Sequence, residues 1–208
     1  MKSPSSNNES NNPPPRLIVG ITGASGAIYG VRLLEVLRET TIETHLIISR
    51  AGQTTLAAET NLKVADVEAM ADVVHSNTDL GAACSSGSFR NLGMVIAPCS
   101  IKTMSEIATG VTPNLISRAA DVALKERRRV VLLLRETPLH LGHLRTMAAV
   151  TEAGAIVYPP VPAFYAQPAS LEDMIDHTLG RVLDLFDIDT GRVRRWSGAK
   201  RRPRAPVR

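Results

Sequence analysis

The 208-residue sequence predicts an α/β fold, a single three-layer domain built on an open, mostly parallel sheet. Two observations support this prediction. Short apolar runs alternate with longer segments of helical periodicity along the chain. The runs are apolar at consecutive positions, as expected of strands whose two faces are both covered by helices. This arrangement is Rossmann-like or flavodoxin-like, and in such sheets ligands bind beyond the carboxyl ends of the strands.

The expected elements alternate in order along the chain. Strands are predicted at residues 16–22, 43–49, 93–97, 129–135 and 155–158. Helices are predicted at residues 27–39, 51–59, 66–72, 100–108, 114–127, 141–153 and 171–186. Asn114 and Ser170 stand where N-caps belong, since their side chains can accept a hydrogen bond from the first turn.

The two ends of the chain differ from its middle. We expect a disordered extension at residues 1–15, which is rich in Ser, Asn and Pro and has no apolar segment typical of a signal peptide. One domain is expected at residues 16–190, followed by a basic tail at 191–208. Since no apolar run reaches the ~18 residues of a membrane span, we expect no span and a cytoplasmic protein.

The net charge of +4 comes from the tail, which holds eight positive charges and no acidic residue. Such a tail could bind nucleic acid or anionic lipid, or it could be a solvated or phosphate-facing end. Aromatic residues make up 3% of the chain, which leaves no stacking platform for single-stranded nucleic acid. We therefore expect no nucleic-acid partner.

A glycine-rich turn follows the first strand directly, at residues 23–26. Glycines let the backbone approach a phosphate, and the helix that follows supplies amides and a positive dipole end. The GxGxxG spacing of NAD sites is absent, and Ser49 and Arg50 stand where a ribose-binding acid would end the second strand. The turn therefore favours FMN over a dinucleotide, with a tight turn that binds no ligand as the alternative.

Two further segments follow buried strands. Lys102 lies in the first turn of a predicted helix, where a cation opposes the dipole unless an anion lies there, although a surface lysine is the alternative. Arg135 and Glu136 end the most apolar strand, where Arg suits a phosphate and Glu suits general acid–base catalysis. A salt bridge at the rim of the sheet is the alternative for this pair.

The histidines and cysteines predict no metal site. His140 and His143 have an HxxH spacing, but no third ligand stands in register. Cys84 and Cys99 are too few for a disulfide framework, and we expect two free thiols.

Five segments between residues 17 and 196 together resemble the UbiX-type flavin prenyltransferases, within the wider family of homo-oligomeric FMN proteins that includes flavin-dependent cysteine decarboxylases. They read GITGASGAIYG at 20–30, SSGSF at 85–89, MVIAPCSIKTMSEIATG at 94–110, RETPL at 135–139 and PAFY at 162–165. The resemblance implies transfer of a dimethylallyl group from dimethylallyl phosphate to N5 and C6 of reduced FMN. It also implies a homo-oligomer, a dodecamer in this family, and a UbiD-type decarboxylase that receives the product in quinone synthesis or aromatic acid breakdown.

The resemblance assigns roles residue by residue. FMN would be held by Gly23, Ala24, Ser25, Ser49, Ser100, Ile101, Lys102, Thr103 and Arg135. The phosphate of the prenyl donor would meet Tyr165, Arg181, Lys125 and Arg118, the last two possibly across a subunit boundary. The catalytic residues would be Glu136 and Glu59 as acid and base, Ser25 beside N5, and Trp196 as a stacking aromatic. No DDxxD-type cluster is present to hold Mg²⁺, which fits a metal-independent monophosphate donor.

Three other functions compete with this one. A flavin-dependent decarboxylase acting on a cysteine-derived substrate would carry PASANT-like and PxMNxxM-like stretches, where this chain reads APCSIKT and RETPL. A flavodoxin-like electron carrier would be acidic, with a Thr/Ser-rich phosphate loop in place of GASGA. A purely structural protein would not gather charges where an α/β sheet binds its ligands.

Overall fold

The computed structural model describes residues 14–198 and divides into two compact units. Unit 1 ends at Pro160 and unit 2 begins at Val161. Most of the expected N-terminal extension (residues 1–13) and the end of the basic tail (199–208) lie outside the described residues. No helix among residues 14–198 is long and apolar enough to cross a membrane.

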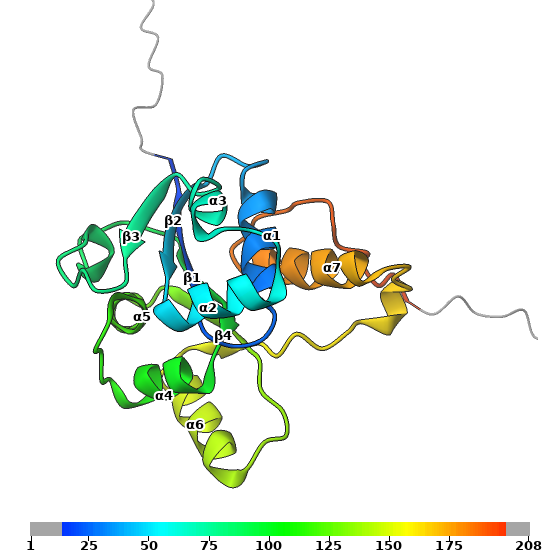
Figure 1. Cartoon of the computed structure of the whole chain (residues 1–208). Coiled ribbons are helices and arrows are strands. Elements are labelled where there is room, and N and C mark those ends of the chain that lie inside the picture. Colours follow the sequence, from blue (N-terminus) through cyan, green and yellow to red (C-terminus); the bar gives the residue numbers. More distant parts are fainter. Residues whose placement is uncertain (1–13, 199–208) are drawn as a thin grey trace, which may run out of the picture. The chain divides into compact units, whose positions relative to one another are not determined.

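Unit 1 contains a six-stranded sheet in the order β3-β2-β1-β4-β5-β6, and every neighbouring pair is parallel (Figure 1). The strands are β1 (Arg16–Ile21), β2 (Glu43–Ile48), β3 (Val73–Ser76), β4 (Gly93–Cys99), β5 (Arg129–Leu134) and β6 (Ile156–Val157). The predicted α/β class is confirmed. The strand order reverses between β1 and β4, and such a switch point is where open α/β sheets bind ligands.

One face of the sheet is covered by α1 (Ala27–Leu37), which contacts β1 and β4. Gly30 makes this close packing possible, because a Cβ there would lie 2.4 Å from the carbonyl oxygen of Ala97 and 2.7 Å from the Ile21 side chain. The neighbouring helices are α2 (Arg50–Glu59), which contacts α1, and the short α3 (Val64–Glu68).

The alternate residues of the strands pack against α4 (Ile101–Thr109), α5 (Leu115–Lys125) and α6 (Leu141–Glu152). This core joins Ile18, Met94 and Leu132 of three adjacent strands to Leu115 of α5. The two cysteines lie in the same core and are free thiols, as expected. Burial raises the pKa of Cys84 to about 11 and also raises that of Cys99, so neither thiol is a nucleophile at neutral pH.

Local signals located most elements within two residues of their observed ends. The side chains of Asn114 and Ser170 accept hydrogen bonds from the first turns of their helices, as predicted. The edge strand β3 was not predicted, because only Val73 and Val74 of its four residues are apolar. The helix expected to run to residue 127 ends at Lys125.

Unit 2 consists of the short turn η2 (Phe164–Ala166), the helix α7 (Leu171–Asp184) and an extended segment that follows it. Gly180 of α7 allows this segment to pass closely, since a Cβ there would lie 2.6 Å from the Val193 side chain. Three arginines of the expected basic tail are bound within unit 2 rather than solvated. Arg192 pairs with Asp176 at 3.0 Å, and Arg194 donates to the Ala166 carbonyl oxygen at 2.7 Å.

Candidate functional site

The carboxyl ends of β1 and β4 are tied together through Thr22. Its hydroxyl donates to the carbonyl oxygen of Pro98 at 2.7 Å and accepts from the backbone amide of Ser100 at 2.8 Å. The neighbouring strands join this edge through backbone hydrogen bonds, from Arg135 to Cys99 at 3.1 Å and from Ser49 to Ile21 at 2.9 Å. The structure therefore brings the predicted FMN residues of four strand ends to one edge of the sheet.

Two glycines draw the first turn of α2 toward the end of β1. A Cβ at Gly23 would lie 2.4 Å from that of Ala51, and a Cβ at Gly52 would lie 2.6 Å from the carbonyl oxygen of Ile21. Side chains at either position would separate α2 from the glycine-rich turn. The glycines are therefore required by backbone packing, and they leave Ala24 and Ser25 at the surface of the turn.

Glu59, at the end of α2, reaches the start of α1. Its Oε2 accepts hydrogen bonds from the amides of Gly26 at 2.8 Å and Ala27 at 2.9 Å, and the Ser25 hydroxyl also bonds to this carboxylate. Burial raises the pKa of Glu59, but these hydrogen bonds and the charge of Arg135 outweigh it and hold the pKa below its usual range. Glu59 is thus an anion that caps α1, and those two amides are already engaged by it.

Arg135 is the cation of this edge. Its side chain is exposed and has no hydrogen-bond partner among residues 14–198. Its charge opposes the effect of burial on Tyr29, whose pKa is raised, and lowers that of Glu59. The adjacent Glu136 is also exposed, and its Oε1 accepts from the backbone amide of Thr137 at 2.9 Å. The alternative of a salt bridge between Arg135 and Glu136 is wrong.

The helices α2 and α4 both begin at this edge with a serine cap. Ser49 accepts from the Gly52 amide at 3.0 Å, and Ser100 accepts from the Thr103 amide at 3.2 Å. The Lys102 side chain is 81% exposed, and its Nζ lies 3.4 Å from the carboxylate of Glu106 on the same helix. The Glu106 carboxylate is thus an anionic partner for a lysine in the first turn of α4, so a bound ligand is not needed to explain its position.

Lys125 lies at the opposite end of the sheet. It is the last residue of α5, which runs back to the amino end of β5. The side chains of Lys125 and Glu126 form an ion pair next to Gly87 of the SSGSF segment. A six-residue strand spans ~20 Å, so Lys125 does not reach the carboxyl edge of its own sheet. Arg118, on the same helix, pairs with Asp121 at 2.9 Å.

The remaining predicted residues lie in unit 2. The ring of Tyr165 meets that of Trp196 edge to face, with centroids 6.1 Å apart. Arg181 lies 2.7 Å from the carboxylate of Asp184, which also binds Arg195 through two hydrogen bonds of 3.0 Å. The structure therefore joins Tyr165 to Trp196, and gives Arg181 a carboxylate partner.

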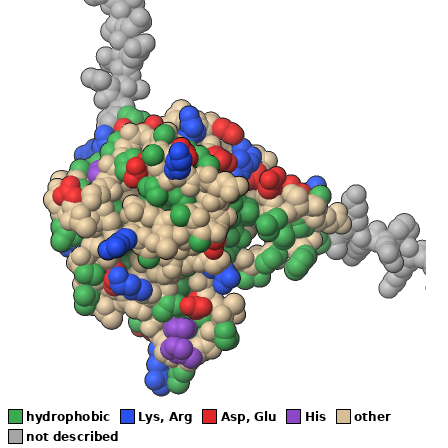
Figure 2. All heavy atoms as spheres, in the orientation of Figure 1, with side chains coloured by type: hydrophobic (Ala, Val, Ile, Leu, Met, Phe, Trp, Pro, Cys, Tyr) green, Lys and Arg blue, Asp and Glu red, His purple; other side chains and the backbone are tan. Residues whose placement is uncertain are grey.

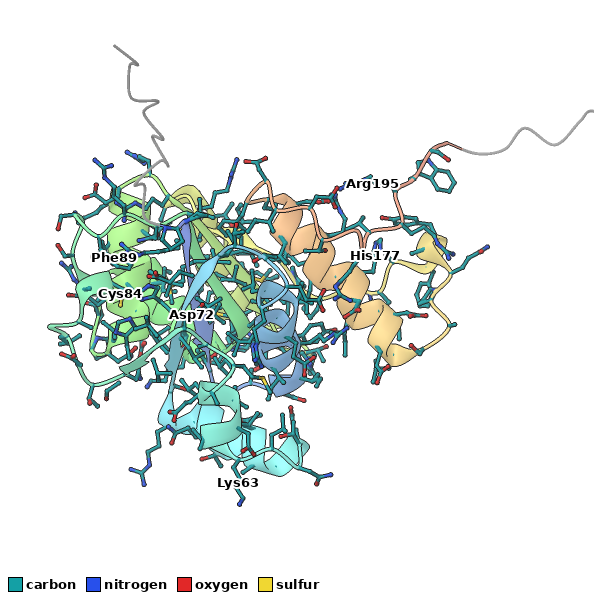
Figure 3. The ribbon with its side chains drawn as sticks, turned by 90° about the horizontal axis from the view of Figure 1, so that it is seen from above. Lys63, Asp72, Cys84, Phe89, His177 and Arg195 are labelled. Atoms are coloured by element: carbon teal, nitrogen blue, oxygen red, sulfur yellow. The ribbon has the colours of Figure 1, made fainter. Side chains whose placement is uncertain are left out.

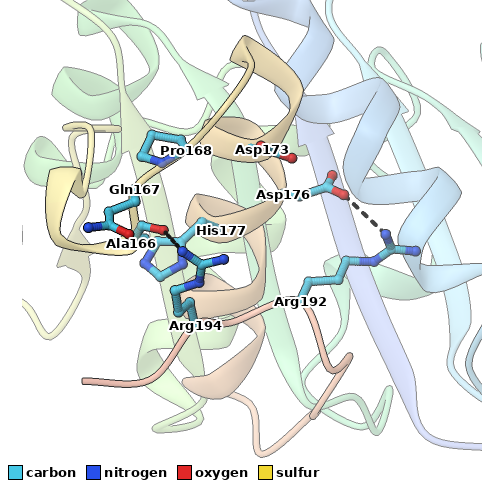
Figure 4. Close-up of a pocket in the computed structure, with 8 residues that line it drawn as sticks. All are labelled: Ala166, Gln167, Pro168, Asp173, Asp176, His177, Arg192 and Arg194. Carbon is cyan, nitrogen blue, oxygen red and sulfur yellow. Dashed lines mark hydrogen bonds and ion pairs between the residues drawn. The ribbon is translucent and has the colours of Figure 1, made fainter. Parts of the chain in front are cut away.

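His177 of α7 was missed by sequence reasoning. Its buried ring lies 3.3 Å, through Nε2, from the Tyr165 hydroxyl. Burial first, and then the charge of Arg181, lowers the pKa of His177, so the ring is neutral at neutral pH. His177, Arg192 and Arg194 line a cavity of about 220 Å³ in unit 2 (Figure 4). No motif surrounds His177 in the sequence, so nothing there signals its contact with Tyr165.

Histidine side chains gather on the surface over α6 (Figure 2). The rings of His140 and His143 lie 3.6 Å apart, and His140 caps α6 by accepting from the Gly142 amide at 3.0 Å. No group of three His, Cys, Asp or Glu side chains suited to a metal ion occurs in the described part of the chain.

A family model described as flavoprotein matches residues 5–188. The flavin prenyltransferase UbiX of Escherichia coli K12 is 59% identical over 187 residues, which are 88% of this chain and 99% of that protein. The flavin prenyltransferase UbiX of Thauera aromatica is 52% identical over 193 residues, covering 93% of this chain and 100% of its own length.

Solved structures agree with these relatives. AnUbiX (PadA1), crystallised in complex with FMN and dimethylallyl pyrophosphate, matches 90% of this chain and 100% of its own with a TM-score of 0.88 and 51% identity. A dodecameric FMN-dependent UbiX-like decarboxylase from Escherichia coli O157:H7 matches 88% of this chain and 100% of its own, with a TM-score of 0.85 and 47% identity.

Proposed function

The chain belongs to the flavoprotein family and, within it, to the UbiX-type flavin prenyltransferases, and we propose that it transfers a dimethylallyl group from dimethylallyl phosphate to reduced FMN. The observation that carries the proposal is the carboxyl edge at the β1/β4 switch point. Here the Arg135 side chain is exposed and has no hydrogen-bond partner among residues 14–198. Its charge lowers the pKa of Glu59, whose carboxylate bonds to the Ser25 hydroxyl. A phosphorylated ring system fits a switch point that offers an unpaired guanidinium.

The residues at this edge fit FMN. Two helices, α2 and α4, start there, and Gly23 and Gly52 let the first turn of α2 lie close to the end of β1. The group that binds at this edge is expected to contact the turn at Ala24 and Ser25 and the first turn of α4 from Ser100 to Thr103. Arg135 would bind an anionic group of the flavin.

The chemistry divides between the flavin and the chain. Reduced FMN supplies the N5 and C6 atoms that accept the dimethylallyl group. Glu59 keeps the hydroxyl of Ser25 oriented at the edge where we expect N5. Glu136 has one carboxylate oxygen engaged by the Thr137 amide, which leaves Oε2 to accept a proton during alkylation. Trp196, in edge-to-face contact with Tyr165, is the aromatic residue we expect beside the allylic group, whereas Tyr165 is expected to meet the donor phosphate.

The phosphate of the donor needs cations, because charge builds on it as the allylic C–O bond breaks. Lys125 is one of the predicted cations, but it lies at the amino end of the sheet. We infer that a second copy of the chain brings its Lys125 to the carboxyl edge of the first. The dodecameric relative supports an assembly in which such a contact forms.

Three finer points stay proposals. The donor is expected to be a monophosphate, although AnUbiX was crystallised with dimethylallyl pyrophosphate. The modified flavin would serve a UbiD-type decarboxylase, and the protein would act in the cytoplasm.

The decisive experiment combines FMN reconstitution with mass spectrometry of the flavin. We expect flavin absorbance after reconstitution and, once the bound FMN has been reduced with dithionite, a dimethylallyl mass gain after anaerobic incubation with dimethylallyl phosphate. A flavin of unchanged mass, together with loss of CO₂ from a cysteine-derived acid, would establish the rival decarboxylase. Running dimethylallyl pyrophosphate in parallel decides the donor.

Subunit complementation tests the shared site. Lys125→Gln and Glu136→Gln are each expected to be inactive, because each damages a different part of the site. Since the two halves would come from different copies, an equal mixture reassembled from subunits should regain about a quarter of wild-type turnover. A mixture as inactive as its parents would place both residues in one copy.

A further inference from the structure

Arg128 binds the SSGSF segment (residues 85–89) with both arms of its guanidinium. Nη1 donates to the carbonyl oxygen of Phe89 at 2.7 Å, and Nη2 donates to that of Gly87 at 2.9 Å. The planar guanidinium fork can reach two carbonyls at once, which a lysine ammonium on a flexible stem does poorly. Two such charge-assisted bonds fix the path of the loop between these residues.

The position of Arg128 is fixed by the way α5 ends. The amide of Arg127 bonds back to the carbonyl oxygen of Leu124 at 3.0 Å, and that of Arg128 bonds to Ala123 at 2.8 Å. With Arg127 in the left-handed region at φ 58°, this pair of bonds is a Schellman motif. Arg128 therefore stands three residues beyond Lys125 on a closed, hydrogen-bonded turn.

The side chain of Phe89 gives the far end of the loop a second anchor. The Phe89 ring packs against the same core cluster as Cys84 (Figure 3). The Arg16 guanidinium lies 5.1 Å from the centroid of the Phe89 ring, and the His45 ring meets it edge to face at 4.9 Å. With Phe89 anchored and Ser86 hydrogen-bonded to Ser88, the bonds from Arg128 tie the loop to the end of α5.

The loop so held lies directly against Lys125. A Cβ built on Gly87 would lie 2.8 Å from Lys125 Nζ and 2.4 Å from Glu126 Oε1. We propose that Arg128 is a positioning residue for the prenyl-transfer site, which holds residues 85–89 beside Lys125 so that the ammonium is presented for the donor phosphate. This inference rests on the proposed function, because it assumes that Lys125 meets the phosphate.

The test compares Arg128→Gln with Arg128→Lys and with Arg90→Gln, a matched loss of charge at an exposed arginine next to the loop. The first readout is amide hydrogen–deuterium exchange of residues 85–89 in the full-length protein. The second is the split between KM for dimethylallyl phosphate and kcat, and the third is FMN affinity. Gly87→Ala adds a variant that disturbs the same contact without changing Arg128.

We expect Arg128→Gln to speed exchange in the loop about tenfold and to raise KM about tenfold, with kcat and FMN affinity nearly unchanged. Arg128→Lys should restore little of the loop protection or of the wild-type KM. Arg90→Gln should match the wild type, and Gly87→Ala should raise KM. Wild-type exchange in Arg128→Gln, or full recovery by Arg128→Lys, would overturn the proposal. If the wild type transfers no dimethylallyl group, the proposed function fails, whereas the exchange data still decide whether Arg128 holds the loop.

Discussion

Replacing Glu59 tests whether this carboxylate holds the start of α1. Its Oε2 accepts from two backbone amides at 2.8 and 2.9 Å, which are groups that a helix leaves without internal partners. Glu59→Ala removes the oxygen that accepts both hydrogen bonds and exposes the two amides to water. Glu59→Gln keeps an acceptor oxygen of the same reach but removes the negative charge from the positive end of the helix dipole.

The expected magnitudes follow from these contacts. Loss of an N-terminal capping acceptor costs about 1 kcal/mol, and loss of an anion at an exposed helix start costs ~0.3–1 kcal/mol. We therefore expect Glu59→Gln to lower the free energy of unfolding by about 0.5 kcal/mol and Glu59→Ala by about 1.5 kcal/mol. Both values are at the modest end, because Glu59 is exposed and solvent screens its charge.

Urea unfolding followed by circular dichroism measures these differences. With a slope of about 2 kcal/mol per molar urea, Glu59→Ala should shift the midpoint by about 0.7 M. The pKa of Glu59 is lowered in the folded protein, so its stabilisation is present above its ordinary pKa of 4.5 and is lost as pH falls through the lower folded value. The gap between wild type and Glu59→Gln should thus close in acid.

Glu68→Gln is the matched control, since this glutamate of α3 makes no side-chain hydrogen bond among residues 14–198. The free energy of unfolding of Glu68→Gln should stay within about 0.5 kcal/mol of that of the wild type. Equal midpoints for wild type and Glu59→Ala at neutral pH would refute the capping role. A gap that persisted in acid would refute its electrostatic part.

Three more outcomes are expected. Glu136→Gln should keep FMN affinity while prenyl transfer falls about 100-fold or more, measured as flavin mass per unit time, and unchanged transfer would remove Glu136 from the proton steps. Gly30→Ala should destabilise the fold by about 1–3 kcal/mol, because its Cβ would lie 2.4 Å from the Ala97 carbonyl oxygen, and a neutral effect in urea would show that α1 shifts freely. The hydrogen bonds from Arg195 lower the pKa of Asp184 and outweigh the opposite effect of burial. Asp184→Asn should therefore have a lower free energy of unfolding than the wild type at neutral pH, and the difference should vanish as acid protonates Asp184.

Local chemistry made much of the fold predictable. A capping serine or asparagine acts within three residues of itself, so Asn114 and Ser170 could be recognised without knowing the rest of the chain. The apolar strands and the glycine turn are local signals too. By contrast, β3 is a strand mainly because β2 offers it a hydrogen-bonding edge, which no residue of β3 reveals.

The site was harder to predict, because its contacts span long sequence separations. Glu59 caps amides 32 and 33 residues away, and nothing near it in the sequence marks it as a cap. Arg128 is one of three consecutive arginines, and its side chain bonds to the carbonyl oxygens of Gly87 and Phe89, 41 and 39 residues away. The resemblance gave Glu59 a role in proton transfer, whereas the structure adds that its carboxylate is already engaged with α1.

We propose that the two edges of the sheet serve different steps, so that assembly of the subunits is part of catalysis. The carboxyl edge carries Ser25, Arg135 and Glu136, which suit a flavin, whereas the amino edge carries Lys125 and the loop that Arg128 holds. Parallel strands of about six residues keep these edges ~20 Å apart in any one copy, a separation that no side chain bridges. On the proposed function, FMN would bind at the carboxyl edge, whereas prenyl transfer would need two copies in contact. Conditions that dissociate the assembly without unfolding it should abolish transfer while flavin remains bound.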